Sequence, residues 1–156
     1  MKEDALVKNK RWKRRDKSSR KWKHKKKKTY RQRKGWYKGY WCDSGWELAF
    51  VIYNLEHNIK FERNKRGFPY TFYKKEHLFY PDFIVEGKYV EIKGIMDRKN
   101  KAKIAAFPEP ITVIQEKEMQ KYLDYVKSKY GKSFANLYEK VERGKTQTNR
   151  TKKRKK

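Results

Sequence analysis

Hydrophobic and polar residues alternate along this chain with two different periods, one typical of helices and one typical of strands. Apolar side chains at three- and four-residue spacing predict three helices, and a more polar segment ended by Pro108 predicts a fourth. These helices span residues 44–58, 97–107, 116–130 and 133–141. The first begins at a capping box, in which Ser44 is the N-cap and Glu47 follows three residues later.

The segments between the helices alternate with period two, or are short and β-branched, which predicts strands. The strands span residues 59–64, 68–73, 78–85, 89–93 and 111–115, of which 68–73 is either a strand or an extended connection. Gly87 and Lys88 are expected to form the two-residue turn of a hairpin. The order helix, three strands, helix, strand, helix, helix predicts an α/β (α+β) domain with a mixed sheet flanked by helices.

Basic residues are concentrated at the two ends of the chain. The 156 residues contain 45 Lys and Arg and 18 Asp and Glu, for a formal net charge of +27. Residues 1–38 carry a net charge of +16 and residues 143–156 one of +8, whereas residues 39–142 are nearly balanced at +3. Like charges at this density repel one another. We therefore expect a largely disordered basic arm at 1–38, a folded domain at 39–142 and a basic tail at 143–156.

The charge also indicates the class of partner. A polyanion is expected, and nucleic acid is favoured over anionic lipid because the N-terminal arm has no amphipathic stripe. No apolar run is long enough for a transmembrane helix or a signal peptide, so we expect no membrane partner and no secretion. Cys42 is the single cysteine and is expected to be a small buried residue. These features predict an intracellular protein, in the host cytoplasm for a viral source or in the nucleus.

Three ionisable residues interrupt the apolar residues of the predicted hairpin. With the turn given above, Lys93 lies opposite Asp82, and Glu91 lies opposite Ile84. The period of two then puts Asp82, Glu91 and Lys93 on one face, with the two carboxylates as diagonal neighbours. Charges among apolar residues are costly to bury unless they are paired or hold a metal ion.

Two carboxylates and a lysine on one face suit the hydrolysis of a phosphodiester. Carboxylate oxygens are the ligands that Mg²⁺ prefers, and Mn²⁺ is its expected substitute. The metal lowers the pKa of a bound water and neutralises the charge that develops on the phosphate. A lysine beside it can orient or deprotonate water, or stabilise that charge. The pattern predicts a metal-dependent nuclease site, which a third acid from elsewhere in the chain would complete.

A family resemblance agrees with this interpretation. Pro81-Asp82, eight intervening residues and Glu91-Ile92-Lys93 resemble the motif of the PD-(D/E)xK nuclease superfamily. The predicted order helix, three strands, helix, strand is the order of that superfamily's core, which is the restriction-endonuclease-like fold. Residues 40–115 look like the small homing-type endonucleases found in phages and other mobile elements.

The resemblance implies roles for individual residues. Asp82, Glu91 and the carbonyl of Ile92 would be metal ligands, and Lys93 would be the catalytic lysine. Glu47 on the first helix would be the third acid, although the capping box alone also explains a glutamate there. The substrate would be DNA, and a homodimer is one way to cut both strands of a duplex.

Other functions remain open from the sequence. A non-catalytic nucleic-acid packaging or ribosome-associated protein would also carry basic arms. On the same fold, a junction resolvase, a recombination or transposition nuclease, or an RNA-cutting relative would share the motif. The blandest alternative is that Asp82 is a turn residue and that Glu91 and Lys93 form an exposed ion pair of little worth. An acidic cluster facing a phosphate backbone without a metal would repel it, which favours the enzyme.

Overall fold

The computed structural model describes residues 29–140, and residues 1–28 and 141–156 lie outside the described part. The α-helices are α1 (Gly45–Glu56), α2 (Arg98–Ala105) and α3 (Glu116–Tyr130), and the 3₁₀ helices are η2 (Tyr30–Gln32) and η3 (Phe134–Leu137). The strands are β1 (Gly35–Tyr37), β2 (Tyr40–Cys42), β3 (Phe61–Arg63), β4 (Phe68–Phe72), β5 (Lys75–Phe79), β6 (Phe83–Val85), β7 (Lys88–Ile92) and β8 (Ile111–Ile114). The described residues therefore form the mixed α and β structure that the periodicity predicts.

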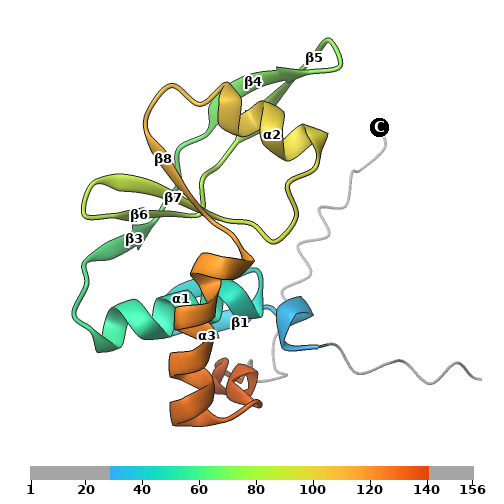
Figure 1. Ribbon diagram of the computed structural model, residues 1–156. Helices are drawn as coiled ribbons and strands as arrows, with labels where there is room; N and C mark the ends of the chain where they lie inside the picture. The colour runs from blue at the N-terminus through green and yellow to red at the C-terminus, as the bar shows by residue number, and fades with distance from the viewer. Residues whose placement is uncertain (1–28, 141–156) are drawn as a thin grey trace, which may run out of the picture.

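A mixed four-stranded sheet, ordered β3-β6-β7-β8, lies in the middle of the molecule. Strand β6 pairs antiparallel with β3 and with β7, whereas β8 runs parallel to β7. A parallel pair needs a crossover connection, and α2 lies in the one that joins β7 to β8. Figure 1 shows α1 and α3 side by side at one end of the sheet, and α2 with the β4–β5 hairpin at the other.

Helix α1 is the centre of the hydrophobic core. Nine of its 12 residues are buried, which is the pattern of a helix covered on nearly all sides. The Ser44 hydroxyl accepts a hydrogen bond from the Glu47 amide at 3.3 Å, so the helix begins where the capping pattern predicts. Phe50 of α1 meets Phe83 of β6 with ring centroids 4.9 Å apart, which joins the helix to the sheet.

Polar contacts fasten α3 against the far end of α1. The Glu56 carboxylate accepts hydrogen bonds from the hydroxyls of Tyr125 and Tyr130 and pairs with the Lys129 ammonium at 2.9 Å. Apolar residues on the other side of α3 join the same core. They are Met119, Tyr122, Leu123 and Val126. Helices α1 and α3 thus pack together and form the base on which one end of the sheet rests.

Part of the predicted basic arm belongs to the folded structure. Strand β1 pairs with β2, and Tyr37 is buried in the main core. Tyr30 lies against the start of α1, where a Cβ on Gly45 would overlap the Tyr30 carbonyl group. Folded structure therefore extends to the N-terminal side of residue 39. The predicted arm before residue 29 and the predicted tail at 143–156 lie outside the described residues.

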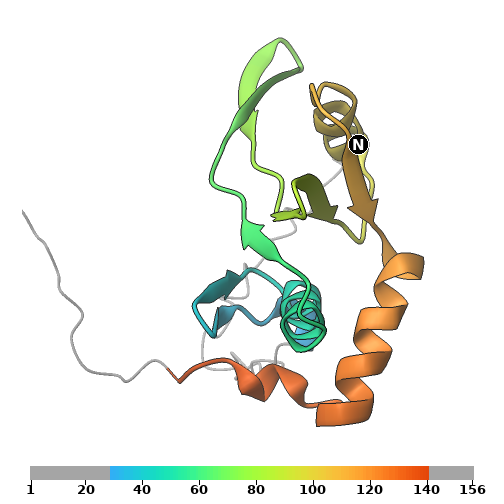
Figure 2. The same ribbon diagram turned by 90° about the vertical axis from the view of Figure 1, so that its left-hand side faces the viewer.

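The β4–β5 hairpin is inserted between β3 and β6 and projects from the sheet (Figure 2). Helix α2 packs against β4, and Phe107 just after α2 contacts Phe68 and Phe79 at ring distances of 4.7 and 5.7 Å. These rings form a small second apolar cluster that holds the base of the hairpin. Apart from this insertion and the β1–β2 hairpin, the chain order is α1, three strands, α2, one strand and α3.

Three segments of the structure differ from the predicted elements. Residues 78–85 are not one strand, because the chain passes from β5 of the hairpin to β6 of the main sheet at Tyr80–Asp82. Lys75 and Glu76 belong to β5 in spite of their polarity, since the projecting hairpin exposes both residues. Residues 133–141 form only the 3₁₀ helix η3. Within residues 29–140, none of the helices combines the length and apolarity needed to cross a membrane.

Candidate active site

The β6–β7 hairpin places Asp82 opposite Glu91. The strands pair Phe83 with Val90, and the same register continued by one residue pairs Asp82 with Glu91. The turn is Glu86–Gly87, with φ values of 49° and 81°. Positive φ at both central residues is the signature of a type I′ turn, which matches the twist of the flanking strands.

The predicted turn at Gly87 and Lys88 is therefore wrong by one residue. The register shifts by two, so Asp82 faces Glu91 and does not face Lys93. Because strand side chains alternate with period two, a two-residue shift leaves every side chain on its predicted face. The error brings the two carboxylates closer together than predicted, as direct neighbours and not diagonal ones.

Asp82 is a half-buried carboxyl group held by the neighbouring strand. Its Oδ2 accepts a hydrogen bond from the Ile92 amide at 2.8 Å. Burial raises the pKa of Asp82 to about 8, and the charges of Glu91 and Glu47 add to the increase, while the Ile92 amide and Arg63 act in the opposite direction. Three carboxylates thus lie within electrostatic reach of one another, and Asp82 holds its proton at neutral pH unless a cation is present.

Glu91 is a buried carboxylate with only one of its oxygens satisfied. It is 3% exposed, and its Oε1 pairs with the Lys103 ammonium of α2 at 2.7 Å. Its Oε2 is buried and has no hydrogen-bond partner among the described residues. A buried oxygen of this kind is costly, because it has lost its hydration without replacement. The unpartnered oxygen is the strongest sign that a further group belongs beside Glu91.

Glu47 does serve the start of α1, in a form different from the predicted capping box. Its carboxylate accepts a hydrogen bond from the Asp43 amide at 3.0 Å, and the Arg63 guanidinium pairs with it. Arg63 also pairs with Asp43 at 3.0 Å. At 6% exposed, Glu47 is buried near Asp82, and Arg63 of β3 neutralises it there. The Glu47 side chain therefore both caps the start of α1 and lies near the acidic pair.

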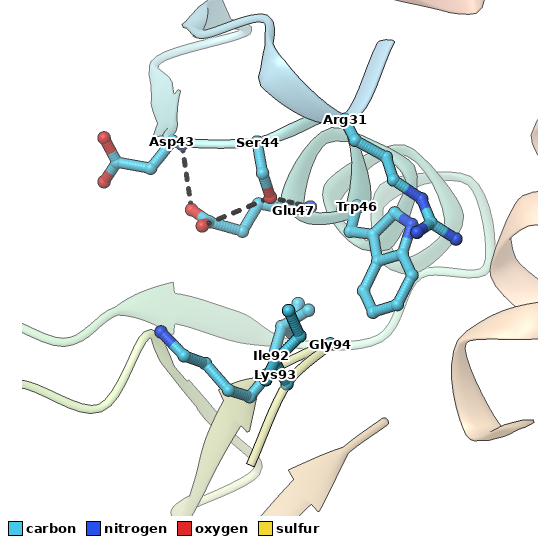
Figure 3. Close-up of a pocket in the computed structure, with 9 residues that line it drawn as sticks. Arg31, Asp43, Ser44, Trp46, Glu47, Ile92, Lys93 and Gly94 are labelled. Atoms are coloured by element: carbon cyan, nitrogen blue, oxygen red, sulfur yellow. Dashed lines mark hydrogen bonds between the residues drawn. The ribbon is translucent and has the colours of Figure 1, made fainter. Parts of the chain in front are cut away.

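Lys93 lies between two cavities. The first, of about 450 Å³, is lined by the start of α1 and the end of β7, including Glu47, Trp46 and Lys93 (Figure 3). Figure 3 shows Glu47 and Lys93 on opposite walls of this cavity, each carried by its own element. The second, of about 420 Å³, is lined by Lys93, by residues of α2 and by the base of the β4–β5 hairpin. Among the described residues Lys93 forms no ion pair, so its charge is available to a ligand.

The acids suit a hard divalent cation, but they do not form a finished cage. Among residues 29–140, no three His, Cys, Asp and Glu side chains are gathered closely enough to hold a metal ion. Arg63 engages Glu47 and Lys103 engages Glu91, so positive side chains neutralise these acids. The free Oε2 of Glu91 and the raised pKa of Asp82 fit a cation that would compensate both. Asp82 and Glu91 are the residues best placed to hold it.

Sequence reasoning missed the pairing of Arg63 and Lys103 with the acids of the site. A signal for Arg63 was present, since it shares the period-two face of Phe61 and a cation on an inward face needs acidic partners. Lys103 gave no such signal, because its partner Glu91 is 12 residues away on another element. The predicted burial of Cys42 is confirmed, and burial raises the pKa of its thiol to about 12, which keeps it protonated.

No family model matches the chain, and neither the curated proteins nor the solved structures contain a match to it. The fold and the geometry of the site therefore carry the functional argument.

Proposed function

We propose that this protein is a Mg²⁺-dependent endonuclease that hydrolyses phosphodiester bonds in DNA. The observation that carries the proposal is the half-buried Asp82 within electrostatic reach of the buried Glu91, whose Oε2 has no hydrogen-bond partner among the described residues. Lys93 follows two residues after Glu91, just past the end of β7, and lines both cavities. A pure nucleic-acid binder gains nothing from a buried acidic pair, because carboxylates repel phosphate.

The acidic residues and Lys93 would have different roles in the reaction. Asp82, Glu91, the Ile92 carbonyl and Glu47 would hold the metal, with Mn²⁺ as a substitute. When bound, Mg²⁺ supplies a water of lowered pKa and a positive charge beside the phosphate. Lys93, whose ammonium forms no ion pair within residues 29–140, would orient the attacking water and stabilise the charge on the phosphate oxygens.

Arg63 and Lys103 would neutralise the acids of the site while no metal is bound. Each pairs with one of the acids, Arg63 with Glu47 and Lys103 with Glu91. These pairs lower the cost of burying the acids when no metal is present. Once a metal holds the acids, both cations can turn toward the substrate phosphates, which attract them more strongly than neutralised carboxylates do.

The order of helices and strands along the chain is a second observation that supports the proposed nuclease function. Setting aside the β4–β5 insertion, helix α1 is followed by three strands, helix α2 and strand β8, and β8 is parallel to β7. This is the order that resembles the PD-(D/E)xK superfamily, with Asp82 before β6 and Glu91 on β7. We include in the proposal the homing or mobile-element type of enzyme, with a homodimer for double-strand cleavage.

A cleavage assay on supercoiled plasmid tests the proposal. The full chain should nick or linearise the plasmid with Mg²⁺ or Mn²⁺ and be inert in a chelator. Asp82→Asn, Glu91→Gln and Lys93→Ala should each lower the rate at least about 100-fold while still binding DNA. Glu62→Gln is the matched control, because Glu62 is exposed on β3 and its change should leave cleavage intact.

The same assay separates the alternatives. Linear duplex, branched DNA and RNA offered side by side distinguish a general endonuclease from a junction resolvase or an RNA-cutting enzyme. Cleavage by Asp82→Asn and Glu91→Gln at the wild-type rate would remove the basis of the proposal. A wild-type chain that binds all three substrates and cuts none would favour a packaging protein.

A further inference from the structure

The described residues contain three hairpins with a two-residue turn, and one of these turns has no glycine. The β1–β2 turn is Lys38–Gly39 and the β6–β7 turn is Glu86–Gly87, and all four residues have positive φ. The β4–β5 turn is Tyr73–Lys74, with φ values of 47° and 60°. Type I′ turns favour Asn-Gly because a Cβ at positive φ is strained.

The β4–β5 turn therefore keeps two large side chains at a cost in stability. Tyrosine and lysine are poor residues for positive φ, and such strain persists at sites where the side chains have a function. The chain uses glycine at the second position of the other two turns, so the favourable solution is available to it. The residues of the β4–β5 turn are therefore not those that its geometry favours, which indicates a role for their side chains.

These side chains are presented to solvent. Tyr73 is 72% exposed, and its ring contacts Phe72 with centroids 4.3 Å apart, so the tip carries a pair of aromatic rings. Lys74 and Lys75 are exposed beside them. Leu78 and Tyr80 add two more large exposed side chains along the hairpin and at its end. Figure 2 shows the hairpin extending away from the helices of the base.

The surroundings of the hairpin are strongly basic. Residues 65–80 and 97–105, which form the hairpin and α2, contain eight Lys and Arg and two Asp and Glu. Helix α2 packs against β4, so the two basic segments are neighbours. A projecting ribbon with aromatic rings at its tip and cations around it is complementary to a nucleic acid, where bases lie between rows of phosphates.

We propose that the tip of the β4–β5 hairpin, residues 72–75, enters the major groove of duplex DNA bound at the candidate active site. A two-stranded ribbon fits the major groove, which is about 12 Å wide. Lys74 and Lys75 then contact phosphates, and the Tyr73 ring contacts base edges. The identity of the ligand as DNA rests on the proposed function, whereas the groove contact is a property of the hairpin.

The second cavity links the proposed groove contact of the hairpin to Lys93, the proposed catalytic lysine. Tyr70 and Phe79 of the hairpin line the same cavity as Lys93 and Lys103. A duplex engaged by the tip would then extend along the hairpin toward the cavity that Lys93 lines. The hairpin contributes to affinity and to the positioning of the duplex, and takes no part in bond cleavage.

The variant Tyr73→Asn tests the proposal in the full chain. Asparagine accepts positive φ and leaves the net charge unchanged, so the melting temperature should rise by about 2–5 °C. Affinity for a short DNA duplex, measured by fluorescence anisotropy in a chelator, should fall about tenfold. The loss should persist at raised salt, because contacts of an uncharged ring are not screened. Tyr73→Phe should retain most of the affinity.

Lys38→Asn is the matched control, since it makes the same replacement at the first position of the β1–β2 turn. It removes one charge, so any loss of affinity should be small and should fade as salt is raised. A Tyr73→Asn chain that is stabilised and binds duplex as the wild type does would overturn the proposal. An equal loss of affinity for a single strand of the same sequence would overturn entry into a groove. Because binding is measured without metal, a failure to cleave counts against the proposed function alone.

Discussion

The Oδ2 of Asp82 accepts a hydrogen bond from the backbone amide of Ile92 at 2.8 Å, which joins the residue before β6 to the end of β7. The bond fixes Asp82 beside the two residues, Glu91 and Lys93, that flank Ile92 on the central part of the sheet. This side-chain-to-backbone hydrogen bond sets the position of the Asp82 carboxyl group before any ligand is present. A bound cation would change the charge of the Asp82 carboxyl group. The first two predictions concern that charge.

The metal-free protein should lose stability between about pH 4 and pH 8 through Asp82. The fold raises the pKa of this carboxyl from its ordinary value of 3.8 to about 8, so the folded state keeps a proton that the unfolded chain releases. Rising pH then favours unfolding over this interval, and the effect is complete above pH 8. Asp82→Asn removes the titration, so its melting temperature should exceed that of the wild type by several degrees at pH 8 and by little at pH 4.

Thermal melts of both proteins at a series of pH values, in a chelator, measure this difference. Comparing the two proteins cancels the contributions of the groups that do not interact with Asp82. A gap that stays constant from pH 4 to pH 8 would contradict the raised pKa.

Binding of Mg²⁺ should release about one proton near neutral pH. The metal needs the ionised form of Asp82, so its affinity should rise about tenfold per pH unit below about pH 8 and level off above it. Calorimetric titrations in buffers of different ionisation enthalpy count the protons released. Equal affinity at pH 6 and pH 8, with no proton released, would mean that Asp82 does not bind the metal.

Replacing Lys103 should make the fold depend on metal. Lys103→Met keeps an unbranched apolar side chain but removes the ammonium that lies over the Phe79 ring and leaves Glu91 buried without its ion pair. In a chelator the loss should be about 3 kcal/mol of unfolding free energy. Mg²⁺ should restore more stability to this variant than it adds to the wild type, because the metal replaces the missing positive charge.

Denaturant titrations with and without Mg²⁺ measure this rescue. Lys101→Met on the same helix is the control, since Lys101 is exposed and its replacement should cost little in either condition. A Lys103→Met protein that Mg²⁺ stabilises no more than the wild type would argue against a cation site at Glu91.

Capping and metal binding by the start of α1 can be separated with two variants. Ser44→Ala removes the side-chain acceptor for the Glu47 amide and should cost about 1 kcal/mol without altering cleavage. Glu47→Gln can still accept the hydrogen bond from the Asp43 amide, but it removes the charge that pairs with Arg63. It should therefore lower both stability and the rate of cleavage, and higher Mg²⁺ should partly restore the rate. Equal cleavage by the two variants would leave Glu47 with a structural role alone.

Local patterns predicted much of this fold because local physics determines it. Ser44 and Glu47 specify the start of α1, since the capping groups are within one turn of each other. The shared face of Asp82 and Glu91 was predictable from the period of two, although the turn was misplaced. Glycine can occupy either central position of a short turn, so only the preference for glycine second, as in Glu86–Gly87, distinguishes the two registers.

Long-range charge pairing was not predictable in the same way. Arg63 and Lys103 meet their acidic partners only after β3 and α2 have packed against the sheet. The inclusion of Lys75 and Glu76 in strand β5 was not predictable from the sequence for a related reason. Strand β5 is buried only at Phe79, and its outer residues face solvent, so polarity there says little about secondary structure.

The approach of Tyr30 to Gly45 has a consequence for substrate capture. Arg31, next in the chain, lines the cavity of Lys93 and lies over the Trp46 ring at 4.6 Å, so the described chain begins at the rim of that cavity. Under the proposed function, a polyanion bound by the basic residues 1–28 would be tethered to the rim, and a short link would raise its local concentration to about the millimolar range. The arm would then govern how often a phosphate reaches Lys93, and residues 82–93 would govern what happens once it is there.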